Sequence, residues 1–338
     1  MIFGRRRVLA AMGASVLAAP AGSIRPVAAQ DARFFRIASG PTESSLFQAG
    51  TLIGQIVSSP PGARDCARGG ACGVPGMIAV NQTTAGSVAN LDLLAAGRID
   101  SILAQADFAH AAFVAGGPWR GKPPFAHLRV LAHLYPETLH VVVRRAAGIA
   151  DLRGLRGRPI SLGERESGTA TNARAILAAA NLPERDIRAQ YLKTAEAVEA
   201  MKDGKLDAFF DTAAVPSALI RELAQEREIA LLPLDGLIAR LRPQQPFLSA
   251  TTIPAGVYPN VGETPSLSVG ILWLTLAATD DAIAQGLVRA LWHPNNRRAL
   301  EGHPALGRLI RADAAAESFG LPLHAGAAAH YAEGGVTR

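Results

Sequence analysis

The sequence has little of what catalytic sites are commonly built from. Only two of its 338 residues are cysteines, and its eight histidines are scattered, with no pair at the spacing of metal ligands. The Gly-x-Ser-x-Gly elbow of serine hydrolases, the His-Glu-x-x-His pair of zinc proteases and the Gly-x-Gly-x-x-Gly loop of dinucleotide-binding enzymes are all absent. We therefore expect no catalytic residue, no metal and no cofactor.

Strong charge of one sign is also missing once the N-terminus is set aside. The formal net charge is +6, and residues 1–29 contribute four arginines and no acidic residue, which leaves +6 − 4 = +2 for the rest. This balance excludes a nucleic-acid-binding protein on charge grounds. The remaining chain, about 310 residues, exceeds the size at which a single core usually stops growing. We therefore expect two lobes.

Long hydrophobic runs are lacking too, because a membrane-spanning helix needs roughly 20 apolar residues. The arginines at 5–7 precede a short apolar stretch at 8–19 and the small residues at 27–29. This order is typical of a twin-arginine signal peptide. We predict a signal peptide at 1–29, cleaved after Ala29, and a mature protein that is exported and soluble in the periplasm.

The two cysteines, Cys66 and Cys72, lie in a loop rich in proline and glycine at 60–76. An even number of cysteines in an oxidising compartment predicts a disulfide that holds this loop. A zinc site is disfavoured because two sulfurs lack a third and fourth ligand and the loop contains no histidine. A redox-active pair is disfavoured because the spacing is not Cys-x-x-Cys.

Strand and helix patterns alternate along the chain, which is typical of βα units on a parallel sheet. In the first part we predict strands at 34–39, 77–81, 101–105, 128–134 and 139–145, and helices at 44–58, 87–96 and 107–114. A second series has strands at 159–162, 187–192, 206–211 and 229–234, and helices at 168–180, 195–202 and 216–227. After an irregular stretch, a strand at 267–277 and a helix at 281–292 follow.

This order predicts two α/β lobes, between which the chain passes near Leu139 and returns near Pro265. Lobe I is expected to comprise 31–139 and 265–338, and lobe II to comprise 140–264. Ligands of open α/β sheets bind beyond the carboxyl ends of the strands. We therefore expect a ligand cleft between the lobes.

Polar loops rich in hydroxyl groups follow several of the predicted strands. Ser87 begins one helix, Ser167 and Thr169 begin another, and residues 39–45 follow the first strand. The first turn of a helix has free N–H groups and positive potential, so it suits an anion. Each serine could also serve simply as a helix cap. If the loops bind a ligand, they should face a common cleft.

Several blocks of sequence occur in the order found in one known family. They include Ala-Gly-Ser-Val-Ala-Asn at 85–90, Gln-Ala-Asp at 105–107, Leu-Tyr-Pro-Glu-Thr-Leu-His at 134–140, Ser-Gly-Thr at 167–169 and Leu-Pro-Leu-His-Ala-Gly-Ala at 321–327. Over nearly all of its mature length, the chain resembles the TAXI-type solute receptors of tripartite ATP-independent periplasmic (TRAP) transporters.

The resemblance implies a type II-like periplasmic binding protein, in which each lobe is a sheet flanked by helices and the ligand lies between the lobes. It implies a receptor that closes on a small organic anion or amino acid, such as a dicarboxylate or glutamate, and delivers it to membrane permease subunits. The ligand-binding positions that it implies are Gly40, Thr42, Ser44, Ser45, Ser87, Gln105, Tyr135, Ser167, Gly168, Thr169 and Asp211.

One block departs from the family pattern, because Glu43-Ser44-Ser45 stands where a Gly-Gly-Thr-Tyr type of loop is usual. The Glu43 carboxylate would repel a dianion but could hold an ammonium group; alternatively, it points into solvent. Tyr135 could contact the ligand or pack at the hinge, and Asp211 could bind an amine or hold the loop before Pro216.

Two other functions remain open from the sequence. A receptor that serves a sensor protein instead of a permease would have the same fold and site. An exported hydrolase with Ser87 or Ser167 as nucleophile would need a general base that the sequence does not identify.

Overall fold

The computed structural model describes residues 32–334, except 244, 246 and 305, and these belong to one compact unit. The predicted signal peptide at 1–29 lies outside the described residues. No helix in the described part of the chain is both long and apolar enough to cross a membrane.

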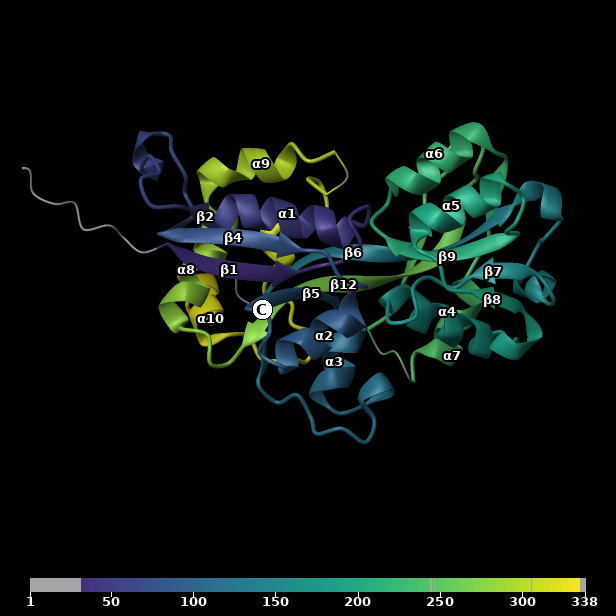
Figure 1. Cartoon of the computed structure of the whole chain (residues 1–338), viewed down its shortest axis with the longest axis horizontal. Coiled ribbons are helices and arrows are strands. Elements are labelled where there is room, and N and C mark those ends of the chain that lie inside the picture. Colours follow the sequence, from purple (N-terminus) through teal and green to yellow (C-terminus); the bar gives the residue numbers. More distant parts are fainter. Residues whose placement is uncertain (1–31, 244, 246, 305, 335–338) are drawn as a thin grey trace, which may run out of the picture. The chain divides into compact units, whose positions relative to one another are not determined.

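A mixed sheet of twelve strands runs through the unit (Figure 1). At one end, β4 (Met77–Gln82), β1 (Arg33–Ala38) and β5 (Ser101–Gln105) are parallel neighbours. At the other end, β8 (Arg188–Gln190), β7 (Pro159–Ser161) and β9 (Ala208–Ala213) form a second parallel set. The long strands β12 (Thr264–Leu276) and β6 (Leu128–Arg144) lie between the two sets and join them.

The central strands decide how the two parallel sets face each other. β12 is antiparallel to both β5 and β6, so β5 and β6 run in the same direction. β9, by contrast, is antiparallel to β6. The carboxyl ends of the two parallel sets therefore point toward one another along β6. The four short remaining strands are β2 (Ser58–Ser59), β3 (Val74–Pro75), β10 (Ile229–Leu231) and β11 (Ser249–Ile253).

Three sequence predictions need correction. The strands predicted at 128–134 and 139–145 form one continuous strand, β6, and the sheet is mixed, because β6 and β12 are antiparallel to their neighbours. Pro136 fits within β6 because β9 pairs with it only from Thr138 onward, so Pro136 has a strand partner on one side only. The stretch predicted as irregular contains α7 (Ile238–Leu241) and β11; β11 is largely exposed and so lacks an apolar pattern.

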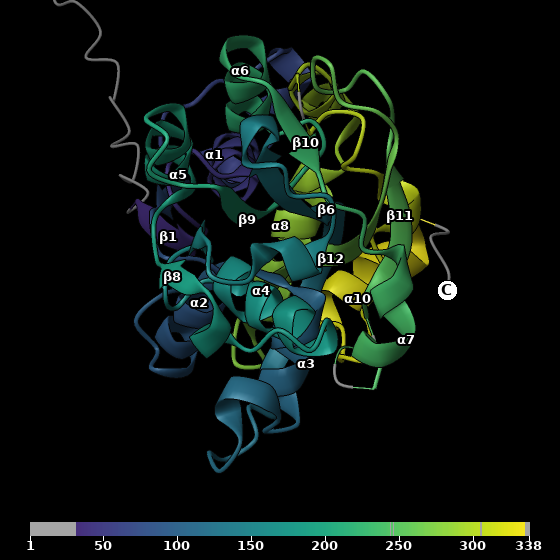
Figure 2. The ribbon, with the colours of Figure 1, turned by 90° about the vertical axis from the view of Figure 1, so that its right-hand side faces the viewer.

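Helices cover both faces of the sheet (Figures 1 and 2). At the β1 end, α1 (Ser45–Val57) lies on one face, and α2 (Ser87–Ala95) and α3 (Ala106–Phe113) lie on the other. At the β9 end, α5 (Thr194–Lys202) and α6 (Ala218–Glu226) lie opposite α4 (Gly168–Ala179) and α7. The remaining helices are α8 (Asp281–Leu291), α9 (Arg297–Glu301) and α10 (Ala325–Glu333).

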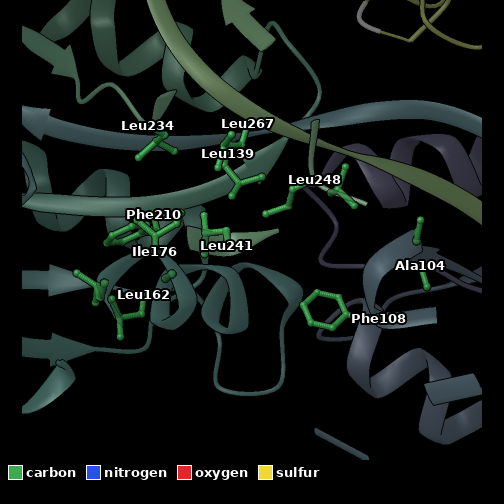
Figure 3. Close-up of a cluster of buried hydrophobic side chains, with 14 of the residues drawn as sticks. Ala104, Phe108, Leu139, Leu162, Ile176, Phe210, Leu234, Leu241, Leu248 and Leu267 are labelled. Atoms are coloured by element: carbon green, nitrogen blue, oxygen red, sulfur yellow. The ribbon is translucent and has the colours of Figure 1, made fainter. Parts of the chain in front are cut away.

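The apolar cores differ between the two faces because strand residues alternate between them. In β6, Val141 and Val143 point to one cluster and Val142 to another. On the face of α2, α3, α4 and α7, a single cluster continues across both ends of the sheet; Figure 3 shows it from Ala104 and Phe108 at one end to Leu162 at the other. On the opposite face, α1, α8 and α10 cover one cluster, and α5 and α6 cover a separate one.

The predicted disulfide between Cys66 and Cys72 is present in the loop between β2 and β3. His293, distant in sequence, places its Nε2 3.6 Å from the Cys66 sulfur, and Asn295 Nδ2 lies 3.6 Å from both sulfurs. Cys66, Cys72 and His293 form the one group of three metal-ligand side chains within the part of the chain described. Sulfurs joined in a disulfide offer no thiolate, so this arrangement fixes the loop on the α8–α9 connection and does not build a zinc site.

Replacing both Cys66 and Cys72 with serine should lower the free energy of unfolding by about 2 kcal/mol, because the disulfide closes a short loop and restricts the unfolded chain. Urea unfolding under oxidising conditions measures the change. Addition of a thiol reductant should lower the stability of the wild type by a similar amount and leave the double variant unchanged. Equal stability of the two oxidised proteins would contradict this role.

Candidate functional site

The ends of the two parallel strand sets enclose a cavity, here called the cleft cavity, with a volume of about 60 Å³. Its lining comes from loops after β1, β4, β7 and β8 with the first residues of the helices that follow them, and from β5, β6 and β9. The polar and glycine positions among its lining residues are Gly40, Ser44, Gly86, Ser87, Gln105, Glu137, Gly163, Glu164, Ser167, Gly168, Thr169, Lys193, Thr194, Asp211 and Thr212. Eight of the eleven positions implied by the family resemblance are therefore brought together.

The first turn of α2 faces the cleft cavity. Gly86 precedes the helix with φ +110°, a conformation that side chains with a Cβ rarely adopt. Asn90 is the first residue of this helix whose N–H bonds back along the chain, to Gly86 O at 2.9 Å. Ser87 Oγ accepts the N–H of Gln105 at 3.1 Å, which leaves its hydroxyl hydrogen for another acceptor. The turn can therefore donate hydrogen bonds to a ligand oxygen.

The first turn of α4 lies across the cavity from α2. Ser167 caps this helix, which was one of the two roles that the sequence allowed for it. Its Oγ accepts the N–H of Ala170 at 3.0 Å and donates to Glu164 O at 2.7 Å. The N–H groups of Gly168 and Thr169 precede the first bonded turn of the helix. This second positive helix end therefore reaches the same cavity.

Ser44 caps the N-terminus of α1 in the same way that Ser167 caps α4. Its Oγ accepts the N–H of Phe47 at 3.2 Å and donates to Pro41 O at 2.7 Å. A Cβ at Gly40 would lie only 2.6 Å from this Oγ, so glycine allows the loop after β1 to fold tightly against the cap. Both residues line the cleft cavity.

Glu137 of β6 forms a fully buried part of the cavity lining. Ser45 Oγ donates to its Oε1 at 2.5 Å, and Gln105 Nε2 donates to its Oε2 at 3.1 Å. Asn172 of α4 in turn donates to Gln105 Oε1 at 3.2 Å, so side chains from α1, β6, β5 and α4 are linked. Burial, with the negative charges of Asp211 and Asp107, raises the pKa of Glu137 to about 8.

Asp211 of β9 lines the cleft cavity and also an adjoining one, here called the side cavity, of similar volume. Thr194 Oγ1 donates to Asp211 Oδ1 at 3.1 Å. Burial and the charge of Glu43, which lines the side cavity, raise the pKa of Asp211 to about 6. Glu43 therefore contributes negative charge to the site and does not simply point away from it.

Three implied positions do not reach the cleft cavity. Ser45 lines only the side cavity, where its hydroxyl also accepts the N–H of Ala214 at 3.3 Å. Tyr135 is fully buried in the apolar cluster with α1 and α8 and lines neither cavity, which fits the hinge-packing alternative. Thr42 is exposed, and its hydroxyl donates to the carboxylate of Glu43 at 3.0 Å.

Sequence reasoning assigned no role to Glu137, Glu164, Lys193, Thr194 or Thr212, which also line the cleft cavity. For Glu137 the sequence did hold a signal. It is the one acidic residue of β6, and the apolar residues Leu134 and Leu139 lie near it on either side. Such a residue is rarely buried without a specific partner.

The NMT1-like family matches the chain over residues 37–335. Among solved structures, PhnD1 from Prochlorococcus marinus MIT 9301, in complex with methylphosphonate, has 10 % identity and a TM-score of 0.53 over 85 % of this chain and 94 % of that one. A protein from Bordetella bronchiseptica RB50 has 17 % identity and a TM-score of 0.50 over 90 % and 82 %. The alkanesulfonate-binding protein SsuA from Xanthomonas axonopodis pv. citri, bound to MOPS, has 18 % identity and a TM-score of 0.46 over 89 % and 84 %.

At these identities the structural similarity establishes the fold, the mixed α/β fold of type II periplasmic binding proteins, as predicted from the sequence. The loops that meet at the cleft cavity follow the carboxyl ends of strands from both parallel sets, which is where ligands of open α/β sheets generally bind.

Proposed function

From the premise that the chain belongs to the NMT1-like family, which includes the TAXI-type receptors that the sequence resembles, we propose a specific receptor function. Proteins of this family bind solutes for transport and are non-enzymatic, so the chain is a solute-binding protein and not an enzyme. We propose that it acts in the periplasm, binds a small organic anion or amino acid in the cleft cavity, and delivers it to the permease subunits of a TRAP transporter.

The observation that supports this proposal most directly is the meeting of two helix N-termini at one cavity. The first turns of α2 and α4, with Ser87 and Thr169, line the cavity from opposite ends of the sheet. Each turn offers unpaired N–H groups and a positive dipole end, and together they suit a carboxylate. A ligand held by both turns is in contact with both halves, so it favours the closed arrangement over an open one.

The hydrogen-bonded side chains beneath the cavity support the same proposal. Gln105 accepts from Asn172 and donates to Glu137, so the floor of the cavity is fixed by groups from both ends of the sheet. Such a floor is preorganised only when the two ends approach each other. We infer that ligand binding and closure depend on one another.

The experiment that tests this function is a ligand screen on the purified mature chain. Amino acids and small carboxylates are added one at a time, with thermal stabilisation and calorimetric affinity as readouts, because a ligand that binds only the native state stabilises it. We expect binding of at least one member of these two classes without chemical change. Stabilisation by none of them, or product formation from any, would contradict the proposal.

Replacing Ser87 with alanine should weaken the affinity for the ligand found in this screen about tenfold, because a hydrogen bond to a charged oxygen contributes about 1.5 kcal/mol. Isothermal titration calorimetry measures the change. Ser249→Ala, an exposed position on β11, serves as the matched control and should bind like the wild type. Equal affinities for all three proteins would remove Ser87 from the binding site.

A further inference from the structure

The disulfide loop and the α8–α9 connection bring together three side chains that can bind a metal. Cys66, Cys72 and His293 each offer one ligand atom, and these atoms lie within 4.8 Å of one another. The loop itself contains no histidine, so folding supplies the third ligand from 227 residues beyond Cys66. Two thiolates and one imidazole are a donor set that zinc accepts, with the fourth position of its tetrahedron left to water.

The oxidised loop does not bind a metal, because sulfurs joined in a disulfide offer no thiolate. The reduced loop is a different chemical species. A chain with the export signal that we predict at 1–29 is made in the cytoplasm, where thiols are kept reduced, and its disulfide persists only in an oxidising compartment. The protein therefore holds two free thiols at this loop before it holds the bridge.

The position of His293 matches the spacing of zinc ligands. Bonds of about 2.3 Å to sulfur and about 2.0–2.1 Å to nitrogen, at the tetrahedral angle, place the two ligand atoms about 3.5–3.6 Å apart. Nε2 of His293 lies 3.6 Å from the Cys66 sulfur. The Cα atoms of Cys66 and Cys72 are 4.6 Å apart, so both sulfurs stay within reach of one ion when the bridge opens and their side chains rotate.

Asn295 supplies a hydrogen-bond donor that suits thiolates. Its side-chain Nδ2 lies 3.6 Å from both sulfurs. A disulfide sulfur is uncharged and accepts weakly, whereas a hydrogen bond to a charged acceptor is roughly twice as strong. This donor is therefore better matched to reduced, ionised cysteines than to the bridge. Groups that bond to metal ligands from outside commonly stabilise them in this way.

Other contacts hold the two ligand-bearing segments together without the disulfide. Asn296 Nδ2 donates to Cys72 O at 3.4 Å and to a carbonyl of α8 at 2.8 Å. Within the loop, the N–H of Gly70 donates to Asp65 O at 3.0 Å. His293 also lines a surface cavity of about 740 Å³, which gives an ion a path from solvent. These contacts do not depend on the bridge, so the three ligands remain assembled in the reduced protein.

We propose that the reduced protein binds one Zn²⁺ through the thiolates of Cys66 and Cys72 and through Nε2 of His293, and that formation of the disulfide releases the ion. This site is separate from the cleft cavity and does not depend on the solute bound there.

The protons and electrons of both steps balance. Binding of Zn²⁺ displaces the two thiol protons. The ring proton of His293, which lies on Nε2 while Nδ1 accepts the N–H of Asn295 at 3.2 Å, moves to Nδ1. Release needs an oxidant of the disulfide class: it takes two electrons from the two thiolates, the Cys66–Cys72 bond forms, and two protons from solvent complete the two thiols of the reduced oxidant.

The deciding experiment titrates Zn²⁺ into the purified mature chain in two redox states. A trialkylphosphine opens the disulfide under anaerobic conditions, and calorimetry with a competing chelator measures the affinity. We expect one Zn²⁺ per reduced chain and no binding by the oxidised chain at the same concentrations. A low-molecular-weight disulfide should then release the ion, which a metallochromic indicator detects. Failure of the reduced chain to bind, or equal binding by the oxidised chain, would overturn the proposal.

His293→Asn tests the third ligand without disturbing the local turn. Its side-chain oxygen can still accept the N–H of Asn295, but Nε2 is lost. We expect the zinc affinity of the reduced variant to fall at least about tenfold. His127→Ala, at an exposed position, is the control and should bind like the wild type. Zinc affinity of the wild-type level in His293→Asn would overturn the assigned site.

Cobalt(II) gives a readout that needs no variant. Bound in place of zinc to the reduced wild type, it should show the thiolate charge-transfer absorption and the intense visible bands of a tetrahedral ion. An octahedral spectrum without thiolate absorption would contradict the proposed ligands.

Discussion

Raising the pH from 6.5 to 8 should lower the free energy of unfolding of the unliganded protein by roughly 1–2 kcal/mol. Burial raises the pKa of Glu137 from 4.5 to about 8 and that of Asp107 from 3.8 to about 7. At the start of this window both groups are ionised in the unfolded chain but protonated in the native state, and they lose these protons as the pH reaches their native pKa values. Native protein binds more protons, so its stability falls as pH rises, by up to about 1.4 kcal/mol per pH unit for each group.

The lower limit of this window is set by the histidines. Burial lowers the pKa of His140 to about 4 and also lowers the pKa values of His110 and His133. A histidine whose pKa is lowered on folding makes stability rise with pH until its unfolded pKa, about 6.5, is passed. Just above pH 6.5 these histidines still offset part of the loss, by up to about 0.4 kcal/mol each, because half of each is protonated in the unfolded chain at that pH. From about pH 7.5 only the carboxyl groups contribute.

Urea unfolding at pH 6.5, 7, 7.5 and 8 measures this dependence. Glu137→Gln should remove most of the slope, because the amide does not titrate and has nearly the same shape. Glu222→Gln, an exposed position on α6, should leave the slope as it is in the wild type. A flat profile for the wild type, or an unchanged slope for Glu137→Gln, would show that Glu137 is ionised in the native protein at pH 6.5.

Replacing Gly168 with leucine should weaken ligand binding at least about 100-fold, or about 2.7 kcal/mol. A Cβ at Gly168, at the start of α4, would lie 2.4 Å from Gln105 Oε1 and 3.0 Å from the ring of Phe108. Gln105 cannot move aside freely because it is bonded to Glu137 and Asn172. Loss of those two bonds costs about 1 kcal/mol each, and the steric overlap adds to it.

The effect of this substitution should fall on the approach of α4 to β5 and α3 and not on α4 itself. Leucine is a better helix former than glycine by roughly 1 kcal/mol, and Gly168 does not have a positive φ. Gly236→Leu is the control, because a Cβ there meets no atom within 4 Å. Calorimetry with the ligand from the screen measures affinity, and circular dichroism checks folding. Wild-type affinity in a folded Gly168→Leu protein would show that α4 does not close on β5.

Much of the fold could be predicted because its signals are local. Strand β5 and helix α4 begin where the apolar pattern and the cap residue placed them, and Ser167 caps α4 through its own hydroxyl. The Cys66–Cys72 pair is six residues apart, so its bridging also depends on a short stretch of chain. The family match then connected these local elements to one architecture.

The errors arose where the outcome depends on distant segments. The predicted strands at 128–134 and 139–145 left Pro136 outside both, but whether a proline fits in a strand depends on which strands lie beside it, and β9 pairs with β6 only from Thr138. Strand β11 exists because β12 offers it an edge, although its own residues are mostly exposed. A single sequence does not carry this pairing information in its local pattern.

The candidate site shows the same division. Ser87, Ser167 and Gly168 were predicted from helix starts and the family blocks, and they line one cavity. Their role in ligand binding remains a prediction. Glu137 was given no role because its partners, Ser45 and Gln105, are 92 and 32 residues away. The sequence shows an isolated carboxylate among apolar residues, but its hydrogen-bond partners appear only in the folded structure.

The apolar cluster that continues from α2 and α3 to α4 and α7 has a consequence for how a solute enters. If the two ends of the sheet move apart, the apolar contacts within this continuous cluster are exposed to water. The clusters on the opposite face are already separate, so each can remain buried. Such a motion would therefore cost more apolar burial on the face of α2, α3, α4 and α7 than on the opposite face. The rate at which a solute enters or leaves by this motion would then depend on how often the apolar contacts of this cluster separate.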